Sequence, residues 1–204
     1  GDQSTSDTVL LISSQKVPCS SQAQAQEAEF ESALSGVTLA LAADMVRNGE
    51  GTQHVMRVSV TGTTDALALG IGRAVVNSNL VKCAVSGNDP NVGRIAGAVG
   101  SYLGNLGTEG MGLAEGLEIW LGGIQILANR SFKLDGETEV QLSDYMLEAQ
   151  LFPASVPESD RNYPPHERYV EIEVRVGGAR GEAFVVLGSD LTKEYVEVNA
   201  DYRS

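Results

Sequence analysis

One carboxylate, Glu50, stands between two glycines in the stretch "NGEGTQ", which starts at Asn48. A helix-like pattern ends at Asn48-Gly49 and a strand-like pattern begins near Gln53, so Glu50 lies on a glycine-rich connection. Such a turn can simply be solvated. It can also hold a small cationic substrate, because glycine lets the backbone come close to a ligand. The residues alone leave both interpretations open.

Other patterns that carry chemistry are weak. The histidines, His54 and His166, are isolated from each other and from the two cysteines, Cys19 and Cys83, and no metal-ligand spacing occurs. An isolated histidine is more often structural or exposed than functional. The glycines of "LGIGRA" and "GAVGSYLGNLG" lack the spacing and the lysine of a phosphate loop, and we interpret them as packing glycines. No G-x-S-x-G nucleophile elbow is present.

Composition argues against several classes of partner. The 204 residues include 27 acidic and 14 basic side chains, for a net charge of −13, without a cluster of Lys and Arg. Nucleic acid and anionic membranes are therefore poor partners. No apolar run approaches the roughly 18 residues that a membrane span needs. The two separated cysteines favour free thiols in a reducing compartment.

Hydrophobic patterning predicts one domain, residues 1–204, of the α/β (α+β) class, with a mixed sheet packed against helices. The N-terminal half is predicted as a buried strand at "TVLLIS" (8–13), a long helix that ends at Gly49 with apolar residues at helical spacing (Phe30, Leu34, Val37, Leu41, Met45), a strand at "HVMRVSVTG", a helix at "TTDALALGIGRAVVNS" and a short strand at "LVKCAVSG".

The C-terminal half begins with a turn in "SGNDPNVGR", where we expect Asp89 and Asn91 to bond backbone amides and Arg94 to pair with an acid. The remaining predictions are a close-packed helix with Gly93, Gly97 and Gly100, a hairpin turning at Gly122-Gly123, a helix over 141–150, an antiparallel pair within "YVEIEVRVGGARGEAFVVLGSDL", and a short helical start to the polar C-terminal segment.

Four blocks in order carry a family resemblance: "GDxSTxDT", then "GEG", then "LVKxAxxGxDPNxGRIxxAxG", and finally "DLTxxYVxxNADYRS". Together they resemble the ornithine acetyltransferase family, bifunctional enzymes of arginine biosynthesis that move acetyl between N-acetylornithine and glutamate. The resemblance runs nearly end to end and implies that family's fold, with this chain as the C-terminal part of the β chain. Val92 stands where the family usually has Trp, and Cys83 where Thr or Ala is usual.

The resemblance also implies a reaction and partners. In the family, a precursor cuts itself once, and the new N-terminal Thr becomes the nucleophile of a ping-pong acetyl transfer, with its own amine as the base. That Thr lies upstream of this chain and the oxyanion threonines lie on the α chain, so no catalytic residue, metal or cofactor is expected here. The expected partners are the α chain of the same precursor, in larger αβ oligomers, and the substrates N-acetylornithine and glutamate.

By the same resemblance, the substrate-binding residues are Glu50, Asn199 and Ser204. A carboxylate suits the ammonium of ornithine, Asn199 offers a donor and an acceptor, and Ser204 offers a hydroxyl. Two alternatives stay open: a family member with a different amino-acid acyl donor, and a catalytically inactive descendant that serves as a structural subunit. A bacterial member is expected in the cytoplasm, and a eukaryotic one in the mitochondrial matrix or plastid.

Overall fold

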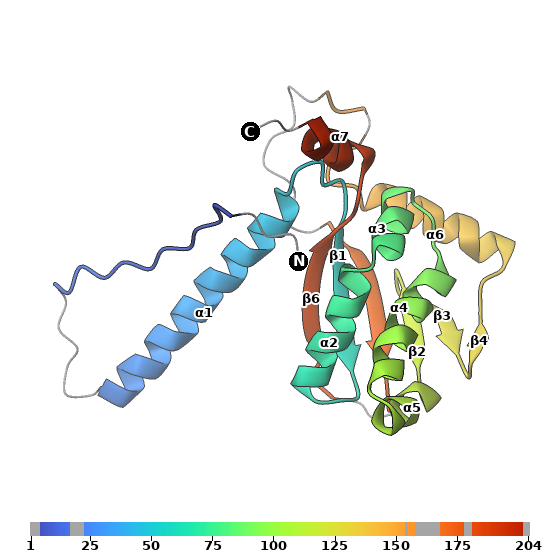
Figure 1. The fold of residues 1–204 in the computed structure, drawn as a ribbon, viewed down its shortest axis with the longest axis horizontal. Helices are drawn as coiled ribbons and strands as arrows, with labels where there is room; N and C mark the ends of the chain where they lie inside the picture. The colour runs from blue at the N-terminus through green and yellow to red at the C-terminus, as the bar shows by residue number, and fades with distance from the viewer. Residues whose placement is uncertain (1–4, 17–22, 154, 158–167, 178–180, 202–204) are drawn as a thin grey trace. The chain divides into compact units, whose positions relative to one another are not determined.

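The computed structural model describes residues 5–16, 23–153, 155–157, 168–177 and 181–201. The chain divides into two compact units, Gly1–Asp44 and Met45–Ser204. The second unit contains a six-stranded mixed sheet with helices packed on it (Figure 1), which confirms the predicted α/β class. The expectation of one domain stays a prediction.

In the first unit, the strand predicted at "TVLLIS" is wrong. Residues 7–16 have no regular secondary structure, and the four apolar side chains of residues 9–12 are 75% to 89% exposed. An apolar run becomes a strand only when a neighbouring strand bonds its backbone, and no described strand does so. The long helix is confirmed as α1 (Ala23–Arg47), although its predicted apolar positions Phe30, Val37 and Leu41 are mostly exposed.

The sheet of the second unit has the order β4-β3-β2-β5-β1-β6. Its strands are β1 (Val55–Thr61), β2 (Glu118–Leu121), β3 (Ile124–Ala128), β4 (Ser131–Phe132), β5 (Val170–Arg175) and β6 (Phe184–Ser189). We expected β5 and β6 to pair with each other, but β1 lies between them, parallel to β5 and antiparallel to β6. Alternation of side chains predicts which face a strand buries; it carries no information about which strand is its neighbour.

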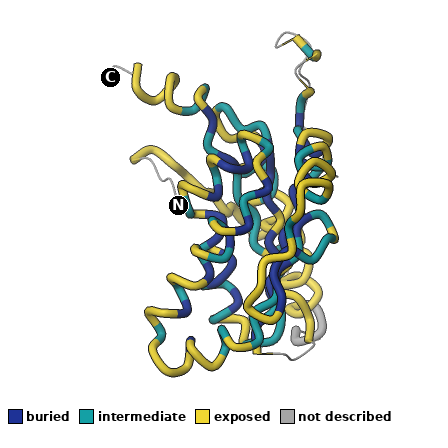
Figure 2. Tube along the Cα trace, turned by 90° about the vertical axis from the view of Figure 1, so that its right-hand side faces the viewer, coloured by how far each residue is buried: buried dark blue, intermediate teal, exposed yellow. Residues whose placement is uncertain are grey.

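The alternating strand is confirmed as β1. Three alternate residues of β1 are at most 1% exposed: Met56, Val58 and Val60. Each lies beside a buried residue of β5 in the parallel register; in the same order, these are Val170, Ile172 and Val174. Figure 2 shows the buried residues concentrated in the strands and in parts of the helices. The sheet therefore has one apolar face, which builds the core with the helices.

Six helices of the second unit follow α1: α2 (Asp65–Val76), α3 (Asn79–Ser86), α4 (Val92–Asn105), α5 (Thr108–Glu115), α6 (Gly136–Glu148) and α7 (Lys193–Asp201). The predicted strand "LVKCAVSG" is wrong, because these residues form α3. The Ser78 side chain accepts the backbone N–H of Val81, and the buried residues Val81, Ala84 and Val85 have helical spacing. No described helix is both long and apolar enough to cross a membrane.

Three predictions about glycines can be checked in this unit; two are confirmed and one is wrong. The hairpin predicted at Gly122-Gly123 is confirmed, with φ of 55° and 80°, a region that two-residue hairpin turns require. In α2, a Cβ at Gly70 would overlap the Tyr102 hydroxyl, so this glycine packs as predicted. In α4, Gly97 and Gly100 are exposed with nothing within 4 Å of an added Cβ, and a Cβ at Gly93 would make only an ordinary contact with Asn91, so the close packing predicted there is wrong.

Candidate functional site

Two of the three predicted substrate-binding residues meet in the structure. Glu50 lies on the turn between α1 and β1, and Asn199 lies in α7, 149 residues later. The Asn199 amide nitrogen donates to Glu50 Oε2 over 3.0 Å and to the Tyr195 carbonyl over 2.9 Å. The third residue, Ser204, lies outside the described residues.

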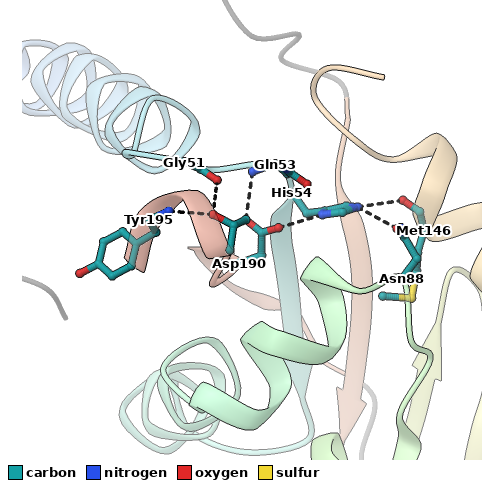
Figure 3. Close-up of polar contacts among 8 residues, drawn as sticks. Gly51, Gln53, His54, Asn88, Met146, Asp190 and Tyr195 are labelled. Carbon is teal, nitrogen blue, oxygen red and sulfur yellow. Dashed lines mark hydrogen bonds and ion pairs between the residues drawn. The ribbon is translucent and has the colours of Figure 1, made fainter. Parts of the chain in front are cut away.

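The turn that carries Glu50 is bound directly to the start of α7, and Figure 3 labels Gly51 and Tyr195 on the two sides of this contact. Thr192 Oγ1 donates to the Gly51 carbonyl over 2.7 Å and accepts the Tyr195 backbone N–H over 3.1 Å. Gly51 has φ of +64°, and a Cβ on it would lie 2.5 Å from the Tyr195 nitrogen. The second glycine of "GEG" is therefore explained by the close approach of two backbones.

A buried pair, His54 and Asp190, lies next to this turn (Figure 3). Asp190 Oδ2 is 2.9 Å from His54 Nδ1, and both side chains are fully buried. Asp190 Oδ1 accepts the Gln53 backbone N–H over 3.0 Å, and the Asp190 N–H donates to the His54 carbonyl over 3.1 Å. The exposed alternative for His54 is therefore wrong, and the residue has a structural role at the start of β1.

Both ring nitrogens of His54 face acceptors. His54 Nε2 is 3.2 Å from the Met146 carbonyl, which can only accept, and 3.1 Å from Asn88 Oδ1. On the other side, Nδ1 faces the Asp190 carboxylate. The buried ring is therefore held between the Asp190 carboxylate on one side and the Met146 carbonyl and Asn88 side chain on the other. This pair joins β1, the end of β6, α6 and the turn before α4.

Glu50 and Asn199 are themselves exposed. Two grooves of about 660 and 680 Å³ lie elsewhere, one over β1, β2, β5 and β6 and the other beside α4, and neither includes Glu50 or Asn199. An exposed carboxylate beside an amide can bind a cation or a hydrogen-bonding group, but it supplies no nucleophile.

The block "SGNDPNVGR" has a structural role that differs in detail from the prediction. Asn91, rather than Asp89, bonds the backbone: its Oδ1 accepts the Arg94 N–H over 3.1 Å and caps α4. Asp89 accepts instead from the Asn91 side chain over 3.0 Å, and the Arg94 guanidinium donates to the Leu80 carbonyl rather than to an acid. Among the described residues, no group of three His, Cys, Asp or Glu side chains could hold a metal ion. His166 and Cys19 lie outside the described residues, whereas Cys83 is an exposed free thiol.

Residues missed by the sequence analysis are Asn88, Asp190 and Thr192. Asp190 contacts His54 across 136 residues, and Thr192 contacts Gly51 across 141. Asn88 has φ of 54°, its carbonyl accepts the Ser143 hydroxyl over 2.8 Å, and its side chain reaches His54. An isolated histidine next to a buried strand signals that a buried polar partner is needed, but the sequence does not identify which carboxylate supplies it.

Comparison with known proteins gives a consistent result. The model of the ArgJ family matches residues 1–204. The arginine biosynthesis bifunctional protein ArgJ of Rhizobium meliloti is 32% identical over the whole chain, and that of Bifidobacterium longum is 33% identical. In both cases this chain spans 44% of the relative's length. The crystal structure of ArgJ from Bacillus halodurans superposes with a TM-score of 0.70 and 29% identity, covering 99% of this chain and 84% of that one.

The family match spans the full sequence, and the fold agrees with a solved member at an identity that supports more than shared architecture. The resemblance to the ornithine acetyltransferases and the fold expected from it are thereby confirmed. The chain belongs to the ArgJ family.

Proposed function

We propose that this chain forms one part of the amino-acid binding site of an acetyltransferase, which moves acetyl from N-acetylornithine to L-glutamate. The observation that carries the proposal is the contact between Glu50 and Asn199 at 3.0 Å. Two polar residues from distant parts of the chain meet at the ends of elements fixed to one core. The relatives' shared name, arginine biosynthesis bifunctional protein, supports the choice of pathway.

The chemistry of the two substrates fits this pair of side chains. N-acetylornithine has its α-amine acylated and keeps a free side-chain ammonium, which a carboxylate such as Glu50 can bind. Glutamate carries a carboxylate at the corresponding end, which the Asn199 amide can bind by exchanging its bond to Glu50 Oε2 for one to the substrate. A site with both groups can therefore hold each substrate in turn, as a ping-pong reaction requires.

The covalent steps belong to residues outside this chain. In the proposed reaction, the hydroxyl of an N-terminal Thr attacks the acetyl carbonyl, the C–N bond breaks, and ornithine leaves with the proton that the Thr hydroxyl gave up. The glutamate amine then attacks the acetyl-Thr ester, and the Thr oxygen recovers a proton as it departs. The Thr, an α chain from the same self-cleaved precursor and assembly into αβ oligomers are all parts of the proposal. For a bacterial source, we propose a cytoplasmic location.

One observation favours a second candidate, a catalytically inactive structural subunit. Glu50 and Asn199 are exposed, as side chains of a solvated turn would be. The two candidates differ in whether the protein acquires an acetyl group. The full-length gene product, incubated with N-acetylornithine alone, should gain the mass of one acetyl group on one chain and release ornithine. Added glutamate should remove that mass and appear as N-acetylglutamate.

A matched control replaces the proposed nucleophilic Thr with Ala in separately expressed chains, which should abolish the mass gain. A wild-type protein that is never acetylated, and that forms no N-acetylglutamate, would support the structural subunit.

A further inference from the structure

We propose that the buried pair His54–Asp190, together with Thr192, is a positioning device that sets Glu50 against Asn199. This inference rests on the proposed function, because it takes Glu50 and Asn199 to be the substrate-binding groups. Neither His54, Asp190 nor Thr192 needs to touch substrate. Each acts by fixing the backbone that carries the binding residues.

The three residues of this device lie close in sequence to the two binding residues. A short turn, residues 51–53, separates Glu50 from His54. Asn199 lies in α7, which begins at Lys193, just after Asp190 and Thr192. Asp190 makes three contacts with the segment that leads from Glu50 into β1: with the His54 ring, with the His54 carbonyl and with the Gln53 N–H. The end of β6 and the start of β1 are therefore held in one register.

His54 also fixes this junction to the rest of the core. Its Nε2 faces the Met146 carbonyl at the C-terminal part of α6 and the Asn88 side chain before α4. A buried polar group that loses its hydrogen-bond partner costs free energy, so this network penalises any arrangement that separates His54 from Asp190. A shift of the Glu50 turn would break several contacts at once, so the pair is suited to fixing geometry.

Thr192 passes this geometry from the core to the surface. The residue is 5% exposed, and its hydroxyl donates to the Gly51 carbonyl on one side and accepts the Tyr195 N–H on the other. Gly51 is the residue after Glu50, and the Tyr195 carbonyl accepts from the Asn199 amide. One hydroxyl thus connects the backbone beside Glu50 with the helical turn that orients Asn199.

The test compares Thr192→Val with Thr192→Ser in the full-length protein. Valine keeps the shape and loses both hydrogen bonds, whereas serine keeps the hydroxyl. We expect Thr192→Val to raise KM for N-acetylornithine about tenfold while kcat stays within about twofold, because loosened geometry mainly weakens substrate binding. Thr192→Ser should return KM to within about twofold of wild type. Hydrogen exchange in residues 49–54 and 192–199 should be faster in Thr192→Val alone.

A second comparison separates positioning from loss of stability. Asp190→Asn and the core variant Val60→Ala should both accelerate hydrogen exchange in β1, but only Asp190→Asn should raise KM. If Val60→Ala raises KM equally, the effect is a general consequence of instability and the inference is overturned.

The double variant Glu50→Gln/Thr192→Val distinguishes failure of the inference from failure of the proposed function. If Thr192 acts through Glu50, the Thr192→Val effect should shrink to within about twofold in the Glu50→Gln background. A KM raised by Glu50→Gln but unchanged by Thr192→Val overturns the inference and leaves the function standing. A KM unchanged by Glu50→Gln overturns the proposed function, whatever Thr192→Val does.

Discussion

Replacing His54 with Gln is the sharpest stability test of the buried pair. The substitution removes the imidazole beside Asp190 and leaves that carboxylate with one backbone donor, the Gln53 N–H, at 3.0 Å. The imidazole has a nitrogen on each side, one facing Asp190 and one facing the Met146 carbonyl. Gln has a single amide nitrogen, so it cannot reach both groups in the same way. The variant therefore creates a buried, under-compensated carboxylate.

The expected cost follows from burial. Both side chains of the pair have 0% exposed surface, so solvent cannot replace the lost hydrogen bond. A buried group left without its hydrogen-bond partner costs roughly 1–3 kcal/mol, and more when the group is charged. In His54→Gln/Asp190→Asn the carboxylate is gone as well, and neutral hydrogen bonds are each worth only about 1 kcal/mol. The double variant should therefore be more stable than His54→Gln by at least about 1 kcal/mol.

The assay is hydrogen exchange in the full-length protein, read as the free energy of opening for peptides that cover β1 and the β6–α7 junction. We expect the opening free energy of both segments to fall together in His54→Gln and to recover in part in the double variant. Arg57→Gln, whose partner Glu171 is about one-third exposed, is the control for an accessible ion pair and should cost no more than about 1 kcal/mol. A loss below about 1 kcal/mol in His54→Gln, or a double variant no better than the single one, would refute the dependence of the buried Asp190 carboxylate on His54.

Three further predictions concern local structure. The pKa of Asp135 is lowered because the Thr138 N–H donates to its carboxylate at the start of α6. This stabilisation is complete above the ordinary pKa of 3.8 and is lost as the pH falls through the lower, folded pKa. In Asp135→Asn, the opening free energy of α6 from hydrogen exchange should therefore be independent of pH in that range. Asn91→Ala should destabilise α4 by about 1 kcal/mol in exchange experiments, and Asp89→Ala by less, because Asn91 supplies the cap; equal costs would contradict this assignment. Gly51→Ala should cost at least about 1 kcal/mol at φ +64° and loosen the start of α7, and an unaffected α7 would show that the close approach is unimportant.

Local features of the fold could be predicted because neighbouring residues determine them. The Gly122-Gly123 hairpin and the alternation of β1 depend on turn chemistry and side-chain period alone. The strand predicted at "LVKCAVSG" failed because a short apolar run fits both a strand and a helix, and the Ser78 cap favours the helix.

Long-range features could not be predicted in the same way. Insertion of β1 between β5 and β6 depends on contacts across the whole sequence. The site shows the same division: Glu50 and Asn199 were assigned through family motifs, whereas Asp190 and Thr192 act through bonds that span more than a hundred residues. Such partners belong to the tertiary structure, and no local pattern marks them.

The central claim is that Glu50 binds the side-chain ammonium of the acetyl donor. The measurement is kcat/KM of Glu50→Gln for N-acetylornithine and for N-acetylnorvaline, which lacks that ammonium. Glu197→Gln, which removes another exposed carboxylate from α7, is the matched control.

An ion pair that stays exposed would be worth about 0–1 kcal/mol, whereas one that is covered in the assembled enzyme would cost roughly 2–5 kcal/mol to break. We therefore expect Glu50→Gln, with normal chain cleavage, to lower kcat/KM for N-acetylornithine more than about tenfold while N-acetylnorvaline and Glu197→Gln remain near wild type. Equal kcat/KM values for N-acetylornithine in wild type and Glu50→Gln would contradict the account and make Glu50 a residue of a solvated turn.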